Sequence, residues 1–240
     1  MFFSCLKSEF NKFFSDRYLL ATTIGLIIIM PFLASTLGSY FGESGADLLV
    51  SKMLQGSYLG QVGFVILSAM FFGSEFKRST LRTCFLCTPK RSLFLITKTA
   101  CILLITSVVW IISEAASIAC LLLSDTSVGS SILPGIISFL LPAYISMIEL
   151  VLAAVAVTVI TTSQLISMSI FVSLILGLNG LLLQFGYCMR YIPVTLSMNT
   201  FLIYTQDTYL PISQGLLYQG IWSLALTAAA FLIFIRRPVR

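Results

Sequence analysis

Two carboxylates lie inside long apolar stretches of this sequence and are its most prominent candidates for chemistry. Glu114 falls in the apolar run over residues 99–123, and Glu149 falls in the run over residues 133–160. A charge at the bilayer centre costs about 2.5–3.5 kcal/mol on insertion scales, so such residues usually face the interior of a helix bundle or water. They could line a translocation path, pair with a cationic substrate or carry protons. The alternative is structural: each carboxylate lies near the interface or hydrogen-bonds to a neighbouring span.

Asn179 is a third polar residue in an apolar stretch, within the sequence Gly177-Leu178-Asn179-Gly180. Small residues next to an amide are typical of close helix packing in membranes. Packing is therefore the first interpretation of Asn179. The second adds it to Glu114 and Glu149 as a candidate residue of a translocation path.

Enzyme chemistry finds little support in the residue types. The chain has no histidine, which removes the commonest metal ligand and neutral-pH proton shuttle. No G-x-x-x-x-G-K-[ST] phosphate loop occurs, so we expect no ATP binding by that route. Cys84 and Cys87 form a C-x-x-C pair without a second pair, which favours packing over zinc or redox chemistry. We expect no enzyme activity, no metal and no cofactor bound by this chain.

The elements that must position these residues are membrane helices. The composition is 58% hydrophobic and 10% charged, whereas soluble domains are about 45–50% apolar and about 25% charged. The mean hydropathy is +1.02. Several apolar runs reach the length of about 20 residues that crosses a bilayer. The sequence predicts an all-α polytopic membrane protein, a single transmembrane domain over residues 1–240, with six spans at residues 18–37, 56–73, 99–123, 133–160, 165–185 and 213–235.

The first 17 residues predict an amphipathic helix. One face carries apolar side chains at three- and four-residue spacing, and the other face carries polar ones such as Lys7, Glu9 and Lys12. Such a helix is suited to lie in the plane of the membrane interface. The alternative is a soluble helix that packs on a partner protein. The apolar face comprises Phe2, Phe3, Leu6, Phe10, Phe13 and Phe14.

Residues 186–212 fit neither a free loop nor a span. They include Arg190, Asn199 and Asp207 among many apolar side chains. We expect a semi-buried hairpin of one or two short helices in the outer leaflet. An ordinary extracellular loop is the alternative.

Residues 74–98 form a basic island between two apolar runs. They hold six of the fourteen basic residues and one acid, Glu75. Lys and Arg are retained on the cytoplasmic side of membranes, so this island predicts a cytoplasmic loop. Six spans then place twelve basic residues inside and only Lys52 and Arg190 outside. Both termini are expected to be cytoplasmic.

The same island resembles the signature of type-2 ABC transporter permeases. In that family a Glu precedes a few polar residues, Gly-Thr, a hydrophobic residue and Arg, and a Pro and a basic residue follow before the next span opens with a Lys. Ser79 stands here in place of the usual Gly. The interfacial helix, the six spans and the hairpin before the last span also fit, so the resemblance covers most of the chain. The matching residues are Glu75, Thr80, Arg82, Pro89, Arg91 and Lys98.

The resemblance implies a permease that forms one half of a membrane dimer, as a homodimer or with a sister permease. A separate ATPase subunit, which binds ATP and Mg²⁺, would dock on the loop. The expected cargo of such an exporter in a bacterial cytoplasmic membrane is a drug, an antimicrobial peptide or a lipid-like molecule. Membrane lipid is a further partner, and nucleic acid is not. The resemblance places ATPase coupling on Glu75, Phe76, Lys77, Arg78, Thr80, Leu81 and Arg82, and the rest of the loop motif on Pro89, Arg91 and Lys98.

Two other classes of function stay open at the level of sequence. A proton- or ion-coupled secondary transporter would use Glu149. A membrane scaffold or assembly factor would move no solute at all.

Overall fold

We describe a computed structural model of the chain over residues 2–37, 46–76, 91–124 and 133–236. The described residues are helical and contain no strand. Six stretches are long and apolar enough to cross a membrane, as predicted, so the chain is an all-helical, multi-pass membrane protein. These are α2 (Arg17–Thr36), α3 (Ala46–Phe76), α5 (Arg91–Ser124), α6 (Leu133–Thr161), the α7 stretch from Gln164 to Leu183, and α10 (Ile212–Arg236).

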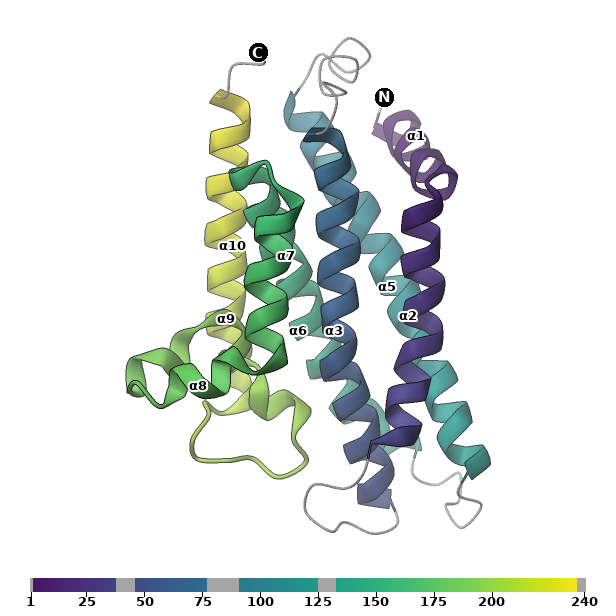
Figure 1. The fold of residues 1–240 in the computed structure, drawn as a ribbon, viewed down its shortest axis with the longest axis vertical. Coiled ribbons are helices and arrows are strands. Elements are labelled where there is room, and N and C mark those ends of the chain that lie inside the picture. The colour runs from purple at the N-terminus through teal and green to yellow at the C-terminus, as the bar shows by residue number, and fades with distance from the viewer. Residues whose placement is uncertain (1, 38–45, 77–90, 125–132, 237–240) are drawn as a thin grey trace.

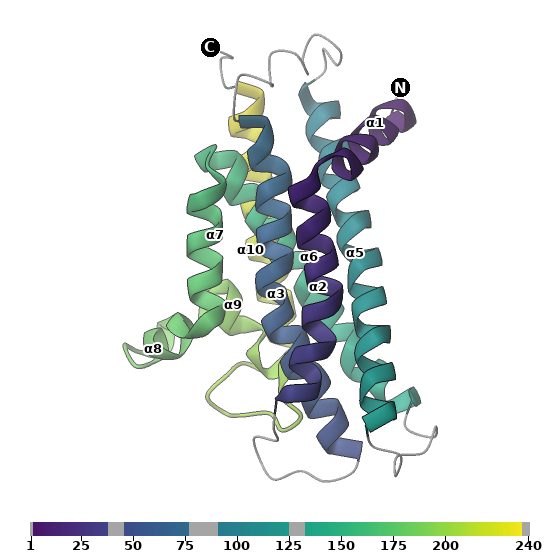
Figure 2. The same cartoon turned by 45° about the vertical axis from the view of Figure 1, so that its right-hand side comes forward.

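The six long helices run side by side, and α1 (Phe2–Ser15) lies across one end of the bundle (Figures 1 and 2). The last turn of α10 lies at that same end, which we call the α1 end. The short helices α8 (Asn179–Leu183) and α9 (Pro193–Leu196) lie toward the opposite end, which we call the α8 end. This arrangement agrees with an even number of crossings.

Helix α3 is central, because it packs against α2, α5, α6 and α7. Its glycines allow α2 to approach closely. A Cβ at Gly63 would lie 2.2 Å from Leu26 Cδ2, and a Cβ at Gly60 would lie 2.8 Å from Met30 Sδ. Small residues at helix contacts in membranes permit such packing. Gly60 and Gly63 therefore mediate a close contact between α2 and α3.

Two helices extend beyond the apolar runs that predicted them. Helix α3 begins at Ala46, so Asp47 and Lys52 lie in a helix and not in the loop expected over residues 38–55. Helix α5 begins at Arg91 and therefore includes Lys98. At 1.5 Å per residue, a 31-residue helix is about 46 Å long, longer than the hydrocarbon core of about 30 Å. Their charged ends can therefore project into the polar region of a bilayer without breaking the helix.

The fifth span is interrupted. Helix α7 (Gln164–Ser173) passes into a π-helical turn, η2 (Leu174–Leu178), in which Gly177 has φ 137°, and α8 follows. Residues 186–212 then form three short helices, η3 (Tyr187–Tyr191), α9 and η4 (Met198–Phe201). One or two short helices were expected in this segment and three are present, and their depth in the lipid stays a prediction.

Helix α1 departs from the predicted division into two faces. Glu9 was assigned to the polar face, yet it is buried, and so is Phe13. Phe3 and Phe14 are exposed. The chain turns at Asp16, whose Oδ1 accepts a hydrogen bond of 2.9 Å from the backbone N–H of Tyr18 and so caps α2. Helix α1 therefore folds back onto the bundle, and its contact with a membrane surface stays a prediction.

Candidate functional site

Four charged side chains meet where α1 contacts the ends of α3 and α5, and we call them the ionic cluster. Lys98 Nζ donates to Glu75 Oε1 at 2.8 Å and to Glu9 Oε2 at 3.2 Å. Lys12 Nζ donates to Glu9 Oε1 at 2.7 Å and to Glu75 Oε1 at 3.3 Å. Among the described residues, two ammonium groups thus face two carboxylates.

The cluster is mostly shielded from solvent. Lys98 is 1% exposed, Glu9 5% and Glu75 7%, while the Lys12 side chain is 43% exposed. A buried charge is tolerated only when it is paired and hydrogen-bonded. Lys98 meets this condition with its two carboxylate contacts. Its ammonium also lies 4.3 Å from the ring centroid of Phe71, within the range of a cation–π interaction.

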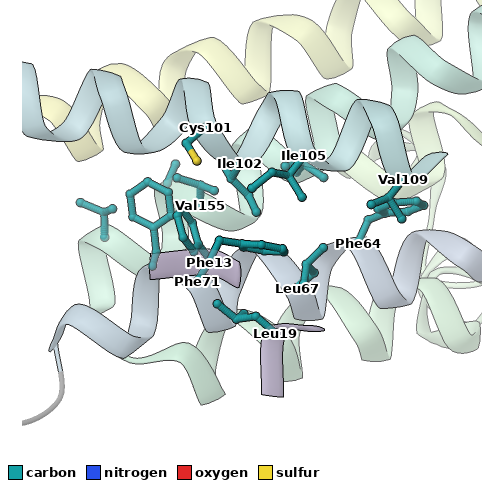
Figure 3. Packing of buried hydrophobic residues seen from close by; sticks show 14 of the residues in the cluster. Phe13, Leu19, Phe64, Leu67, Phe71, Cys101, Ile102, Ile105, Val109 and Val155 are labelled. Carbon is teal, nitrogen blue, oxygen red and sulfur yellow. The ribbon is translucent and has the colours of Figure 1, made fainter. Parts of the chain in front are cut away.

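Aromatic side chains of the apolar core pack next to the ionic cluster. Figure 3 shows Phe13 of α1 next to Phe71 of α3, and their ring centroids are 5.7 Å apart in an edge-to-face arrangement. Both rings belong to the largest core cluster, together with residues of α2, α5 and α6. The ion pairs and this apolar core therefore attach α1 to α3 and α5 at the same place.

The structure brings Glu75 and Lys98, the first and last residues of the loop motif, into direct contact. Phe76 is partly buried against the main core. A guanidinium nitrogen of Arg91 donates to the carbonyl of Ile235, at 3.2 Å, and so links α5 to the end of α10. The other motif residues lie outside the described residues: Lys77, Arg78, Thr80, Leu81, Arg82 and Pro89.

Sequence reasoning missed Glu9 and Lys12 as members of this cluster. Both residues belong to the predicted polar face of the N-terminal helix, which is expected to point away from the lipid. The signal that could have found them is the i, i+3 spacing of opposite charges, combined with a Lys at the start of a span that needs a counter-ion. Glu9 and Lys98 are 89 residues apart in the sequence, and a contact between such distant residues produces no pattern in the local periodicity.

A second set of polar side chains lies deeper in the bundle, and we call it the buried polar layer. Ser57 of α3 donates a hydrogen bond to Glu114 of α5. Gln219 Nε2 of α10 donates to the carbonyl of Ser146, on α6, at 3.1 Å. Gln61 Nε2 of α3 donates to Ser146 Oγ at 3.4 Å. Hydrogen bonds of the layer therefore join α3 to α5 and to α6, and α6 to α10.

Glu149 of α6 faces α10, where a Cβ at Gly220 would lie 3.0 Å from its Oε1. Glu114 and Glu149 each have a buried carboxylate oxygen, Oε2, that has no hydrogen-bond partner within the described part of the chain. Over the same residues no hydrogen bond or ion pair joins the two carboxylates to each other. The predicted path residues are thus placed on neighbouring helices and do not form one paired site.

Asn179 belongs to a different place, at the α8 end. Its Nδ2 lies 3.4 Å from the hydroxyl of Tyr58, and that hydroxyl donates to the carbonyl of Ile175 at 2.7 Å. Asn179 is 4% exposed and lines a cavity of about 390 Å³ next to the interrupted helix. The interpretation of Asn179 as a packing residue agrees with its burial and its contact with α3.

The described residues contain no group of three or more side chains that could hold a metal ion. The arrangement as a whole is suited to positioning helices and to admitting a ligand at the α8 end.

No protein-family model matches this sequence, and a comparison with curated proteins finds no match either.

Proposed function

We propose that the chain is the membrane-spanning permease subunit of an ATP-driven exporter of the type-2 ABC class. A separate ATPase subunit would bind ATP and Mg²⁺, and a second permease would complete the membrane unit. In this proposal the α1 end faces the cytoplasm of a bacterium, and the cargo is a drug, an antimicrobial peptide or a lipid-like molecule.

The ionic cluster is the observation that carries the proposal. Two residues of the motif, Glu75 and Lys98, are paired across the ends of α3 and α5, and both contact α1 through Glu9 or Lys12. The segment between them, residues 77–90, contains most of the predicted ATPase-coupling residues. A partner that moved this segment would therefore move three helices together, because the buried charges cannot separate without a large cost.

The burial of Glu75 refines its role within the proposal. Its carboxylate is bound by Lys12 and Lys98 of the same chain. We therefore assign Glu75 to holding α1 against the α3–α5 hairpin. Direct contact with the ATPase is assigned to the basic residues that follow it, Lys77, Arg78 and Arg82.

The central experiment is co-expression of this chain with candidate ABC ATPases from the same organism, followed by co-purification and reconstitution. We expect a stable complex whose ATP hydrolysis drives export of an amphipathic dye from liposomes. Arg82→Ala should weaken ATPase binding, whereas the matched change Arg190→Ala, at the α8 end, should leave it intact. ATPase binding that is equal in both variants would contradict the assigned coupling segment, and no binding to the wild type would contradict the proposal.

A proton-coupled carrier is the second candidate, because Glu149 has a buried oxygen with no partner among the described residues. That function requires transport driven by a proton gradient without ATP, and loss of transport in Glu149→Gln. The same proteoliposomes distinguish the two candidates when they are energised first by ATP and then by a pH gradient.

A further inference from the structure

The cavity at the α8 end is formed where the fifth span is interrupted. It lies between α3, the η2 turn and η4, and its walls include Tyr58, Leu59, Asn179 and Met198. Gly177, with φ 137°, redirects the chain there, so that α8 leaves the line of α7 (Figure 1). Glycine adopts such a φ without the steric cost that other residues incur. The cavity thus lies where the backbone turn at Gly177 interrupts the helix.

The hydrogen bonds around Tyr58 determine the orientation of the Asn179 amide. The single hydroxyl proton of Tyr58 is donated to the carbonyl of Ile175, at 2.7 Å. The hydroxyl oxygen can then only accept, so the neighbouring group of Asn179 must be its NH₂. The Asn179 carbonyl oxygen therefore does not face Tyr58, and it accepts no hydrogen bond from the described residues. It is not among the buried side-chain atoms that lack a partner, so it keeps accessible surface that a ligand can reach.

The lining limits the chemistry of a ligand. None of the described residues that line the cavity is charged, and most are apolar, which disfavours an ion. The polar side chains of the lining are two hydroxyl-bearing rings and three amides, from Tyr58, Tyr209, Asn179, Gln55 and Gln206. The volume of about 390 Å³ lies within the range of about 300–1,000 Å³ that is typical of small-molecule pockets. Mostly apolar pockets with a few placed polar groups are typical of small-molecule sites.

We infer that this cavity binds an uncharged amphipathic small molecule whose hydroxyl or amide N–H donates a hydrogen bond to the Asn179 side-chain oxygen. The inference concerns binding within one chain. It requires no ATPase and no transport, so it stands or fails separately from the proposed function.

The test is photolabelling of the full chain in lipid nanodiscs with two matched probes. One is 4-(hydroxymethyl)benzophenone, an uncharged alcohol, and the other is 4-methylbenzophenone, which lacks the hydroxyl donor. The labelled residues are located by mass spectrometry of peptides. We expect saturable labelling of cavity residues such as Leu59 and Met198, with a preference of about two- to tenfold for the alcohol, as one hydrogen bond provides.

Three variants make the test specific. Leu59→Trp fills the cavity from α3 and should abolish the saturable labelling, and Met198→Trp should do the same from the opposite wall. Leu104→Trp places the same side chain on a lipid-exposed position of α5 and should change nothing. Asn179→Leu should keep labelling but remove the preference for the alcohol. Thermal unfolding of each variant shows whether it is folded.

The inference is overturned if labelling is non-saturable and spreads over lipid-exposed residues such as Leu104 and Ile111. It is equally overturned if both tryptophan variants in the cavity fold and label like the wild type. An unchanged preference for the alcohol in Asn179→Leu would overturn the assigned role of the Asn179 amide.

Discussion

Lys98 illustrates how one side chain can connect three helices. Its ammonium is almost completely buried, and it contacts carboxylates from α1 and α3 while its own backbone belongs to α5. Removal of one partner from a buried ion pair leaves the others without compensation, and this is more costly than loss of an exposed pair. The two lysines of the ionic cluster contact the same carboxylates but differ in exposure, so they form a natural pair for comparison.

We expect Lys98→Met to lower the free energy of unfolding by about 3 kcal/mol or more, since two buried carboxylates lose the buried cation that joins them. Lys12→Met should cost about 1 kcal/mol or less, because its side chain is 43% exposed and its pairs are screened. The measurement is thermal unfolding of both variants in the same detergent. Equal destabilisation by the two changes would contradict the assigned burial of the cluster.

At Gly177 the backbone conformation itself favours glycine. Gly177→Ala should destabilise the chain by about 1–3 kcal/mol, because φ 137° is strained for any residue with a Cβ. Gly180→Ala is the matched control, since a Cβ there meets no atom within 4 Å and the residue lies in α8. Comparable loss of thermal stability in both variants would argue against strain at Gly177.

At the scale of elements, the contacts between helices depend on small residues more than on the hydrophobic pattern. Lipid tails are as apolar as the side chains, so apolar surface alone does not select a neighbour. Glycines and buried hydrogen bonds do select, as at the α2–α3 contact and in the buried polar layer. At the contact between α10 and α9 a glycine lies directly against backbone. A Cβ at Gly215 would lie 2.1 Å from the carbonyl oxygen of Leu196.

Three Gly→Ala changes should therefore change the stability of the chain to different extents. Gly215→Ala should cost the most, on the order of 2–3 kcal/mol, because a backbone carbonyl must shift. Gly63→Ala should cost less, since Leu26 can change its rotamer. Gly25→Ala meets nothing within 4 Å and should be neutral or stabilising by up to about 1 kcal/mol, through helix propensity. The midpoints of thermal unfolding test this order, and a Gly25→Ala variant as unstable as Gly215→Ala would contradict it.

At the scale of the whole molecule, the two ends of the bundle carry different features. The α1 end holds the ionic cluster, and the α8 end holds the cavity and the short helices of residues 186–212. Both α1 and the last turn of α10 lie at the α1 end of the bundle (Figure 1), so six crossings would place them on one side of the membrane. The proposed function requires that this side be the cytoplasm.

Labelling from outside intact cells tests this orientation. In a cysteine-free background, a membrane-impermeant maleimide should label Asp207→Cys, an exposed position at the α8 end. Ser8→Cys, an exposed position on α1, should be labelled only after the cells are permeabilised. Labelling of Ser8→Cys in intact cells would reverse the orientation and remove the basis for an ATPase at that end.

The sequence by itself determined the fold class and the number of spans, because hydropathy is a local property that each apolar run displays without reference to the others. The resemblance of residues 75–98 to a permease loop motif also indicated Glu75 and Lys98 as candidate site residues, without indicating that they are in contact. Only the tertiary structure decided that Glu9 joins them, that Glu114 and Glu149 occupy separate environments, and that Asn179 lines a cavity. These facts depend on which helices are neighbours and how they are rotated, and packing, not local composition, decides both.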